Sequence, residues 1–271
     1  SPAHGSRFPI MLLTKAQSSG LLIFVLLVLY ILECVFPYFP NFRNKSRHAA
    51  RNIGVIAFNA VVTNLALMPV IILATSGSWG LFARWSWDWR VEFALTILLI
   101  DILTYAVHRQ FHINPFLWRF HRMHHSDTEM DATSGSRFHI GEHLITTCIR
   151  CGLYVACAMK LECLIIYETM FLSNVLFHHA NLGLGNTLDR LYRIVLTSPD
   201  MHKVHHSNIR AEHDSNYTSL LSVWDRIFGT YQISENPKNI VYGINGFEEE
   251  QTVWRMLTTP FRQLQPVDAI K

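Results

Sequence analysis

The chain has 271 residues, of which 50% are hydrophobic and only 16% are charged, and its formal net charge at pH 7 is +3. Because a soluble domain is about one-quarter charged, this composition indicates a protein embedded in lipid. The Lys and Arg residues are spread along the chain rather than gathered into a stripe, so no nucleic-acid partner is expected. The five cysteines lie in apolar runs, which is typical of free, buried thiols rather than of a disulfide framework.

Three apolar runs near the start of the chain predict membrane-spanning helices. They cover residues 17–39, 53–75 and 91–107, and each is long enough to cross a hydrocarbon core of about 30 Å. Pro69 is tolerable in the second run because neighbouring groups in a membrane bundle can pair with the carbonyl that a proline leaves free. No small-residue cleavage site follows Tyr30, so we expect the first run to be an anchor rather than a signal peptide.

The fourth apolar stretch, residues 144–177, is interrupted by Lys160 and Glu162, which leaves two short halves. It predicts a helical hairpin that enters and leaves the membrane on one side. We therefore expect an all-α integral membrane bundle of three spans plus this hairpin, with a histidine-rich helical cap. The predicted regions are transmembrane spans at 1–107, a histidine-bearing catalytic region at 108–231 that includes the hairpin, and a C-terminal tail at 232–271.

The distribution of basic residues predicts which side of the membrane carries the cap. The loop between the first two spans contains Arg43, Lys45, Arg47 and Arg51, whereas only Arg84 and Arg90 lie between the second and third spans. Cytoplasmic loops carry the excess of Lys and Arg, so the first loop is predicted to be cytoplasmic. The N-terminus and the aromatic segment 85–89 would lie on the other side. The chain would then return to the cytoplasm at the first histidine cluster.

Eight histidines form three clusters with the spacing of metal ligands. They are His108 and His112; His121, His124 and His125; and His202, His205 and His206. Pairs three or four residues apart share one face of a helix, and the adjacent last two of a cluster can reach different ions. Eight ligands exceed what one tetrahedral or octahedral ion can hold, so the count predicts a dinuclear centre. His179, which follows the hairpin, is expected as a further ligand.

Other polar residues are candidates for additional ligands or for supporting the ligands. They are His139, His143, His178, Asp101 and Asn181. Asp101 lies seven residues before His108 on the same predicted face, so it is expected to orient a ligand imidazole through its second ring nitrogen, unless it makes only an internal helix contact. The segment Trp224–Arg226 is expected to be a structural corner. The remaining histidines have no partner at ligand spacing and are expected on the surface: His4, His48 and His213.

The motifs HRQFH, HRMHHS, RFHIGEH, HHAN, SPDMHKVHHS, DSNY and VWDRIFGTY occur in this order. With them, over roughly residues 95–231, the chain resembles the fatty acid hydroxylase and sterol desaturase superfamily, in particular its bacterial branch. The resemblance implies that the eight clustered histidines are iron ligands, with His179, in a His-x-Asn motif, as the ninth. Ile140 stands where the family's Arg-Phe-His-Pro-x-Glu segment has proline, so any role of His139 stays open.

The resemblance also implies an activity. It implies two iron ions, O2 as co-substrate, and an external electron donor such as a ferredoxin or a small cytochrome with its reductase, since the chain shows no flavin, haem or iron–sulfur motif. We expect a multi-pass protein of a bacterial inner membrane that hydroxylates a fatty acyl or sterol-like chain at an unactivated C–H bond. Lipid desaturation and ether-lipid monooxygenation remain open. A zinc-dependent membrane hydrolase, with Glu142 or Glu212 as base, is a further alternative.

Overall fold

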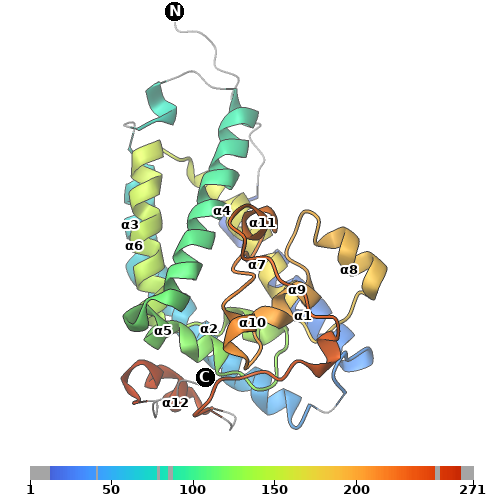
Figure 1. Ribbon diagram of the computed structural model, residues 1–271. Helices are drawn as coiled ribbons and strands as arrows, with labels where there is room; N and C mark the ends of the chain where they lie inside the picture. The colour runs from blue at the N-terminus through green and yellow to red at the C-terminus, as the bar shows by residue number, and fades with distance from the viewer. Residues whose placement is uncertain (1–12, 41, 78–79, 85–87, 248–250, 264–271) are drawn as a thin grey trace, which may run out of the picture.

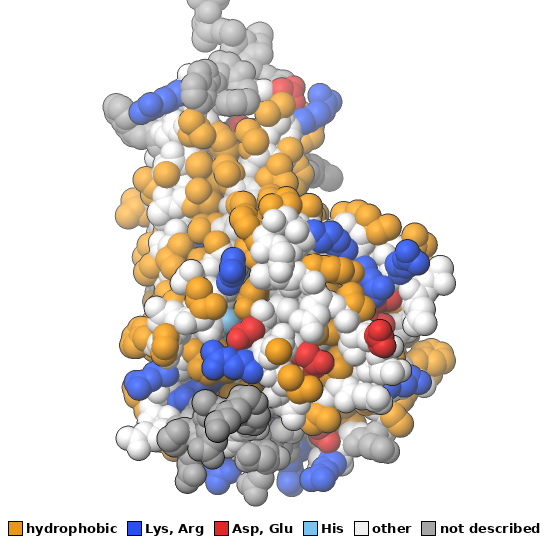
Figure 2. Space-filling view, viewed as in Figure 1, with side chains coloured by type: hydrophobic (Ala, Val, Ile, Leu, Met, Phe, Trp, Pro, Cys, Tyr) orange, Lys and Arg blue, Asp and Glu red, His pale blue; other side chains and the backbone are white. Residues whose placement is uncertain are grey.

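The computed structural model describes residues 13–40, 42–77, 80–84, 88–247 and 251–263. Within these ranges the chain forms helices and no β-strand; two isolated bridges join Leu196 to Leu221 and Ser207 to Tyr242. The predicted all-α fold class is confirmed. Figure 1 shows a column of helices that includes α3, α4 and α6, with further helices gathered at and beside its lower end. Apolar side chains cover most of the column in Figure 2.

Four helical segments are long and apolar enough to cross a membrane. They are α1 (Lys15–Val35), the continuous segment Lys45–Thr75, α4 (Trp89–Ile113) and α7 (Leu161–His179). The second consists of α2 (Lys45–Val62), a π-helix η1 (Thr63–Leu67) and α3 (Met68–Thr75). Pro69 has no N–H to donate to the preceding turn, and the wider π-turn in front of it absorbs this break without ending the helix.

The predicted hairpin is present as α6 (Ile140–Cys157) and α7, joined by a tight turn at Ala158, whose φ is +55°. Its arms are longer than predicted, and α7 alone, at 19 residues, qualifies as a membrane span. The difference arises because both helices continue beyond the apolar stretch into polar residues, 140–143 at one end and 178–179 at the other. Because these end residues include polar side chains, the apolar runs alone did not predict where the two helices begin and end.

The other helices are short, and two of them, α5 and α9, carry the HxxHH clusters. In chain order these helices are η2 (Phe82–Arg84), α5 (Pro115–His125), η3 (Ala132–Ser136), α8 (Asn186–Tyr192), α9 (Pro199–His205), α10 (Arg210–His213), α11 (Val223–Ile227), η4 (Pro237–Asn239), α12 (Val253–Leu257) and η5 (Thr259–Phe261). The helices α5 and α9 begin alike: the side chain of Asn114 or Ser198 caps the first turn, and a proline follows at the first position. Each HxxHH motif therefore lies at the C-terminal end of a short helix whose first turn is capped.

The basic first loop packs against the histidine-bearing segments. The main-chain N–H of Arg43 donates to Glu129 at 3.0 Å, and Nε2 of His48 lies 3.5 Å from a carboxylate oxygen of Asp127. The loop and the cap thus lie on the same side, as the predicted topology requires. The expectation that His48 is on the surface was wrong: it is only 2% exposed, because the segment after α5 covers it.

The predictions for the cysteines are confirmed in part, and two further predictions fall on residues that the structure does not describe. All five cysteines are free, as predicted, but Cys34 and Cys148 are exposed on helix surfaces rather than buried. His4 and the first three residues of the aromatic segment, Trp85–Trp87, lie outside the described residues.

Candidate metal centre

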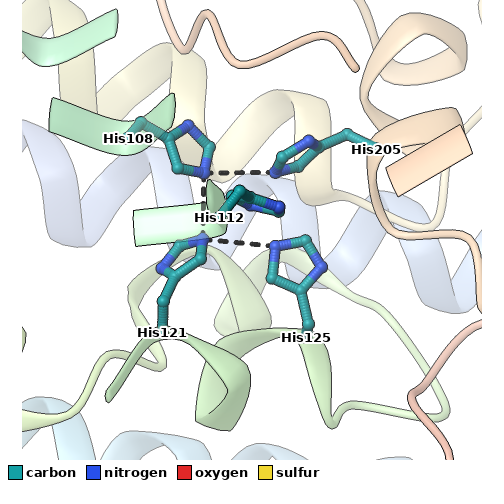
Figure 3. Close-up of side chains that lie close together, drawn as sticks. All are labelled: His108, His112, His121, His125 and His205. Atoms are coloured by element: carbon teal, nitrogen blue, oxygen red, sulfur yellow. Dashed lines mark hydrogen bonds between the residues drawn. The ribbon is translucent and has the colours of Figure 1, made fainter. Parts of the chain in front are cut away.

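Five histidines from three helices direct one ring nitrogen each to a common point. They are His108 and His112 from α4, His121 and His125 from α5, and His205 from α9, and the five nitrogens all lie within 4.8 Å of one another. Figure 3 shows these rings facing inward. Nε2 of His108 is 2.9 Å from Nε2 of His121 and 3.1 Å from Nε2 of His205. We refer to these residues as the five-histidine group.

Four further histidines form a second group beside the first. They are His124, His179, His202 and His206, again with one nitrogen each within 4.8 Å of the others. Nε2 of His179 lies 3.1 Å from Nε2 of His124, 3.0 Å from that of His202 and 3.1 Å from that of His206. In each HxxHH motif the two adjacent histidines join different groups, as their spacing suggested. The structure therefore brings together all nine predicted ligand residues.

The outward ring nitrogens establish which tautomer several of these histidines adopt. Nδ1 of His108 contacts the main-chain carbonyl of Tyr217 at 2.6 Å, and Nδ1 of His205 contacts that of Ser215 at 2.6 Å. A carbonyl oxygen only accepts, so Nδ1 must carry the hydrogen and donate it, which leaves Nε2 unprotonated. Unprotonated Nε2 lone pairs that point at one another repel. Such an arrangement is stable around a cation, so the residues present fit bound metal ions.

Burial keeps the imidazoles in the form that binds metal. It lowers the pKa of His121 to about 3. Burial, reinforced by neighbouring imidazoles, also holds five other pKa values well below the usual value for histidine: those of His124, His125, His202, His205 and His206. Neutral imidazole is the metal-binding form, and it suits iron, zinc or copper.

Two carboxylates lie next to the five-histidine group. Nδ1–H of His121 donates to Oε1 of Glu142 at 2.8 Å, and Oδ1 of Asp214 lies 3.5 Å from Nδ1 of His112. Burial raises the pKa of Glu142 to about 7, and the surrounding histidines oppose this rise. His213 was expected on the surface but is only 9% exposed. Its ring stacks on Trp118, with centroids 5.6 Å apart, because α10 folds back over α5.

The prediction that Asp101 orients a ligand imidazole was wrong. Its carboxylate accepts hydrogen bonds from Nε1–H of Trp224 at 2.8 Å, from Tyr167 O–H at 3.1 Å and from the main-chain N–H of Leu221 at 3.2 Å. Seven residues separate it from His108, which is about 10 Å along a helix axis, so it lies too deep in the span to reach the ring. Asp101 instead ties α4 to α7 and to the start of α11.

The other additional candidates do not join either group in the part of the chain that the structure describes. His139 accepts from the N–H of Gly141 and donates through Nε2 to the carbonyl of Leu257, so it caps α6 and holds the C-terminal segment. Asn181 pairs with the main chain of Phe39 through both amide atoms. His143 lies beside the ring of Phe138, 5.9 Å away, and the ring of His178 lies against that of His202, 3.9 Å away.

Sequence reasoning missed the residues that hold the outward nitrogens. The segment 215–217 supplies two carbonyls to the five-histidine group, and Asn216 between them adopts a left-handed φ of +50°. The carboxylate of Asp225 accepts the N–H groups of Tyr217 and Thr218 at 2.9 and 3.0 Å, which fixes this segment. The sequence feature that could have indicated them was the pair of motifs DSNY and WDR, to which no chemical role had been assigned. Asp225 is the centre of the predicted structural corner.

Comparisons with known proteins agree with this geometry. The sequence model of the fatty acid hydroxylase family matches residues 93–230, which contain both histidine groups. The ornithine lipid hydroxylase OlsE of Rhizobium tropici is 29% identical over 163 residues, covering 59% of this chain and 47% of the relative. Human alkylglycerol monooxygenase is 30% identical over 172 residues, covering 60% of this chain and 35% of the relative. A fatty acid hydroxylase from Lecanicillium, vlmA, is 28% identical over 184 residues, covering 59% and 47%.

The chain spans about half or less of the length of these curated relatives. No solved structure gives a significant match. The family match nevertheless covers about half of this chain, including every residue of the two histidine groups. On this evidence the chain belongs to the fatty acid hydroxylase family.

Proposed function

We propose that this protein is an O2-dependent di-iron oxidoreductase that hydroxylates a membrane lipid at an unactivated C–H bond. The observation that carries the proposal is the convergence of nine histidines, each through one ring nitrogen, on two neighbouring points. In the balanced reaction, a C–H bond, O2, two electrons and two protons give a C–OH group and water. Family membership favours iron, because neutral imidazoles alone do not distinguish iron from zinc or copper.

The two groups define the proposed ligand sets. One ion would bind His108, His112, His121, His125 and His205, and the other would bind His124, His179, His202 and His206. When bound, the two irons supply the redox chemistry that activates O2. The chain's own contribution is to hold the imidazoles neutral and aligned, which the outward contacts to Tyr217, Ser215 and Val175 support.

The burial pattern supports approach of the substrate from the membrane. His108 is partly exposed, whereas the other eight histidines are buried. It lies near the end of α4, one of the four candidate spans. A lipid chain that slides along α4 would therefore meet the five-histidine group without first entering water. The proposed active site lies on the cytoplasmic side of a bacterial inner membrane, where a ferredoxin or a small cytochrome with its reductase would deliver the two electrons.

Ether-lipid monooxygenation is a second candidate, because the relatives include alkylglycerol monooxygenases. Insertion of oxygen at a carbon next to an ether oxygen gives a hemiacetal, which breaks down to an aldehyde and an alcohol. A fatty acyl or sterol-like substrate would instead keep a stable hydroxyl group, and a desaturase would leave a double bond and no new oxygen. The product therefore distinguishes the three reactions.

Metal analysis is the first test. The protein is purified in detergent from iron-supplemented cells, and iron and zinc per chain are measured for the wild type, His124→Ala and His205→Ala, one from each group. His139→Ala is the matched control, because this histidine joins neither group. Two irons per chain in the wild type and control, with fewer in the two test variants, are expected. One zinc per chain, or an unchanged content in the variants, would overturn the di-iron assignment.

The second test follows oxygen into the product. Lipid extracts are incubated with the purified protein, 18O2 and a ferredoxin–reductase pair, and products are analysed by mass spectrometry. One labelled oxygen in a lipid hydroxyl or in an aldehyde is expected. A double bond without label would favour the desaturase, and a hydrolysed lipid without need for O2 would favour the hydrolase.

A further inference from the structure

We propose that Glu142 and Asp214 are positioning residues that make the five-histidine group bind its metal ion more tightly than the four-histidine group. The inference rests on the proposed function, which assigns one ion to each group. It concerns the outward ring nitrogens, whose partners differ between the two groups.

The five-histidine group has two acidic partners on its outer side. The Nδ1–H of His121 donates to Glu142 at 2.8 Å, and Asp214 lies 3.5 Å from Nδ1 of His112, close enough for charge attraction although too long for a good hydrogen bond. The Glu142 side chain is 11% exposed and that of Asp214 is 30% exposed. Glu142 meets the His121 nitrogen that faces away from the group, because Nε2 of His121 faces His108 and His125. Glu142 therefore acts on a ligand rather than as a ligand, whereas Asp214 also lies with His112 and His213 in a third cluster whose potential ligand atoms are within 4.8 Å of one another.

The four-histidine group has no such partner among the residues described. Nδ1 of His179 donates to the carbonyl of Val175 at 2.7 Å, and Nδ1 of His124 and of His202 have no hydrogen-bond partner. Asp127 is the carboxylate that acts electrostatically on His179. It is paired with Arg137 at 2.9 Å, which offsets its charge. Four neutral imidazoles thus surround this position without an anion in contact with them.

This difference in charge has a direct consequence for metal affinity. A carboxylate on the far side of an imidazole fixes the ring and raises the basicity of the coordinating nitrogen, and loss of such a partner typically lowers metal affinity about 10–100-fold. A charge-assisted hydrogen bond is also stronger than a neutral one. Asp214 is also paired with Arg210 at 3.2 Å, which offsets part of its charge. Because Glu142 is closer to its histidine and less exposed than Asp214, its contribution is the larger. The two metal positions are therefore unequal.

Metal titration of the metal-free protein in detergent tests this. Co2+ is added in the presence of a competing chelator, and binding is followed by the absorption of the Co2+–imidazole centre. Two binding steps are expected for the wild type. Glu142→Gln should weaken only the tighter step, by about 10–100-fold, and Asp214→Asn should weaken the same step by a smaller factor. Glu212→Gln is the matched control, because this neighbouring acid contacts neither group, and it should bind like the wild type.

Single-site backgrounds assign the steps. In His202→Ala, which retains the five-histidine group, Glu142→Gln should weaken the remaining step; in His125→Ala, which retains the four-histidine group, it should have no effect. Circular dichroism of each variant verifies that it is folded. Equal weakening of both steps, or no effect in His202→Ala, would overturn the inference. A wild type that binds no second ion would instead contradict the proposed function, whereas two ions without lipid oxidation would leave the inference intact and reject the activity.

Discussion

Nδ1–H of His108 donates to the main-chain carbonyl of Tyr217, 109 residues later in the chain, at 2.6 Å. The carbonyl of Ser215, two residues earlier, accepts from His205 in the same way. Asn216 between these two carbonyls adopts a left-handed φ of +50°. Both carbonyls accept from the five-histidine group, so one short piece of chain orients two of its members. The carboxylate of Asp225 holds this piece by accepting the N–H groups of Tyr217 and Thr218.

Asp225→Asn should therefore disturb the candidate metal centre from a distance. The amide has one acceptor oxygen in place of two, and its NH2 group would face a main-chain N–H, which leaves a buried donor unpaired. We expect a loss of roughly 2–4 kcal/mol in the free energy of unfolding and a lower metal content. Thermal unfolding in detergent and elemental analysis measure both. Thr218→Val, which removes one donor to the same carboxylate, should cost only about 1 kcal/mol. A wild-type melting temperature for Asp225→Asn would contradict this account of the corner.

Gly135 predicts a similar sensitivity on the other side of the centre. A Cβ atom at this position would lie 2.9 Å from the carbonyl oxygen of Val175 and 3.1 Å from Nδ1 of His179. Gly135→Ala should therefore displace the His179 ring, cost about 1–3 kcal/mol, and lower occupancy of the four-histidine group. Gly152→Ala is the control: nothing lies within 4 Å of its Cβ position, and α6 should gain up to about 1 kcal/mol. Equal metal content in both variants would show that the backbone accommodates the methyl group.

Arg122 holds the C-terminal segment against α5. Its Nη2 donates to the carbonyls of Thr259 and Arg262, both at 2.6 Å. Arg122→Ala should release this segment, and limited trypsin digestion should then cleave after Arg255 or Arg262 several-fold faster than in the wild type. Metal content should change little, because Arg122 contacts neither histidine group. Unchanged digestion would mean that other contacts, such as that of His139 with Leu257, suffice to hold the segment.

Spacing along the chain was sufficient to predict eight of the nine histidines that the structure brings together, whereas His179 was predicted from its place after the hairpin and from the family resemblance. Pairs such as His121 and His125 lie one turn apart, so they must share a face wherever the helix goes, and the adjacent pair His205 and His206 must diverge. These constraints are local, and the structure places each residue accordingly. The helical class and three of the four candidate spans were also predictable, because length and hydropathy are local properties of a segment; α7 was predicted only as one arm of a short hairpin.

The wrong predictions concern residues whose partners and burial depend on tertiary contacts. The face of α4 on which Asp101 lies was predicted, but the segment that covers that face comes from Leu221 and Trp224, far along the chain. His48 and His213 have no partner at ligand spacing, and the neighbouring sequence does not indicate that other segments cover them. The role of the Ser215 and Tyr217 carbonyls could not be predicted for another reason. Every residue has a main-chain carbonyl, so residue type does not indicate which carbonyls accept from a histidine.

Glu33 links the first span to the histidine region and provides a graded test of that link. It is 1% exposed, accepts the N–H groups of Ala132 and Asn181 at 2.8 and 2.7 Å, and lies 2.8 Å from Nζ of Lys45. Glu33→Ala leaves two N–H groups and a cation without a partner, so we expect a loss of about 3–5 kcal/mol. Glu33→Gln keeps an acceptor oxygen and should lose less, while Lys45→Met keeps both N–H contacts but leaves the carboxylate unpaired. Melting temperatures in detergent measure the series, and a Glu33→Ala protein as stable as Glu33→Gln would show that the N–H contacts contribute nothing.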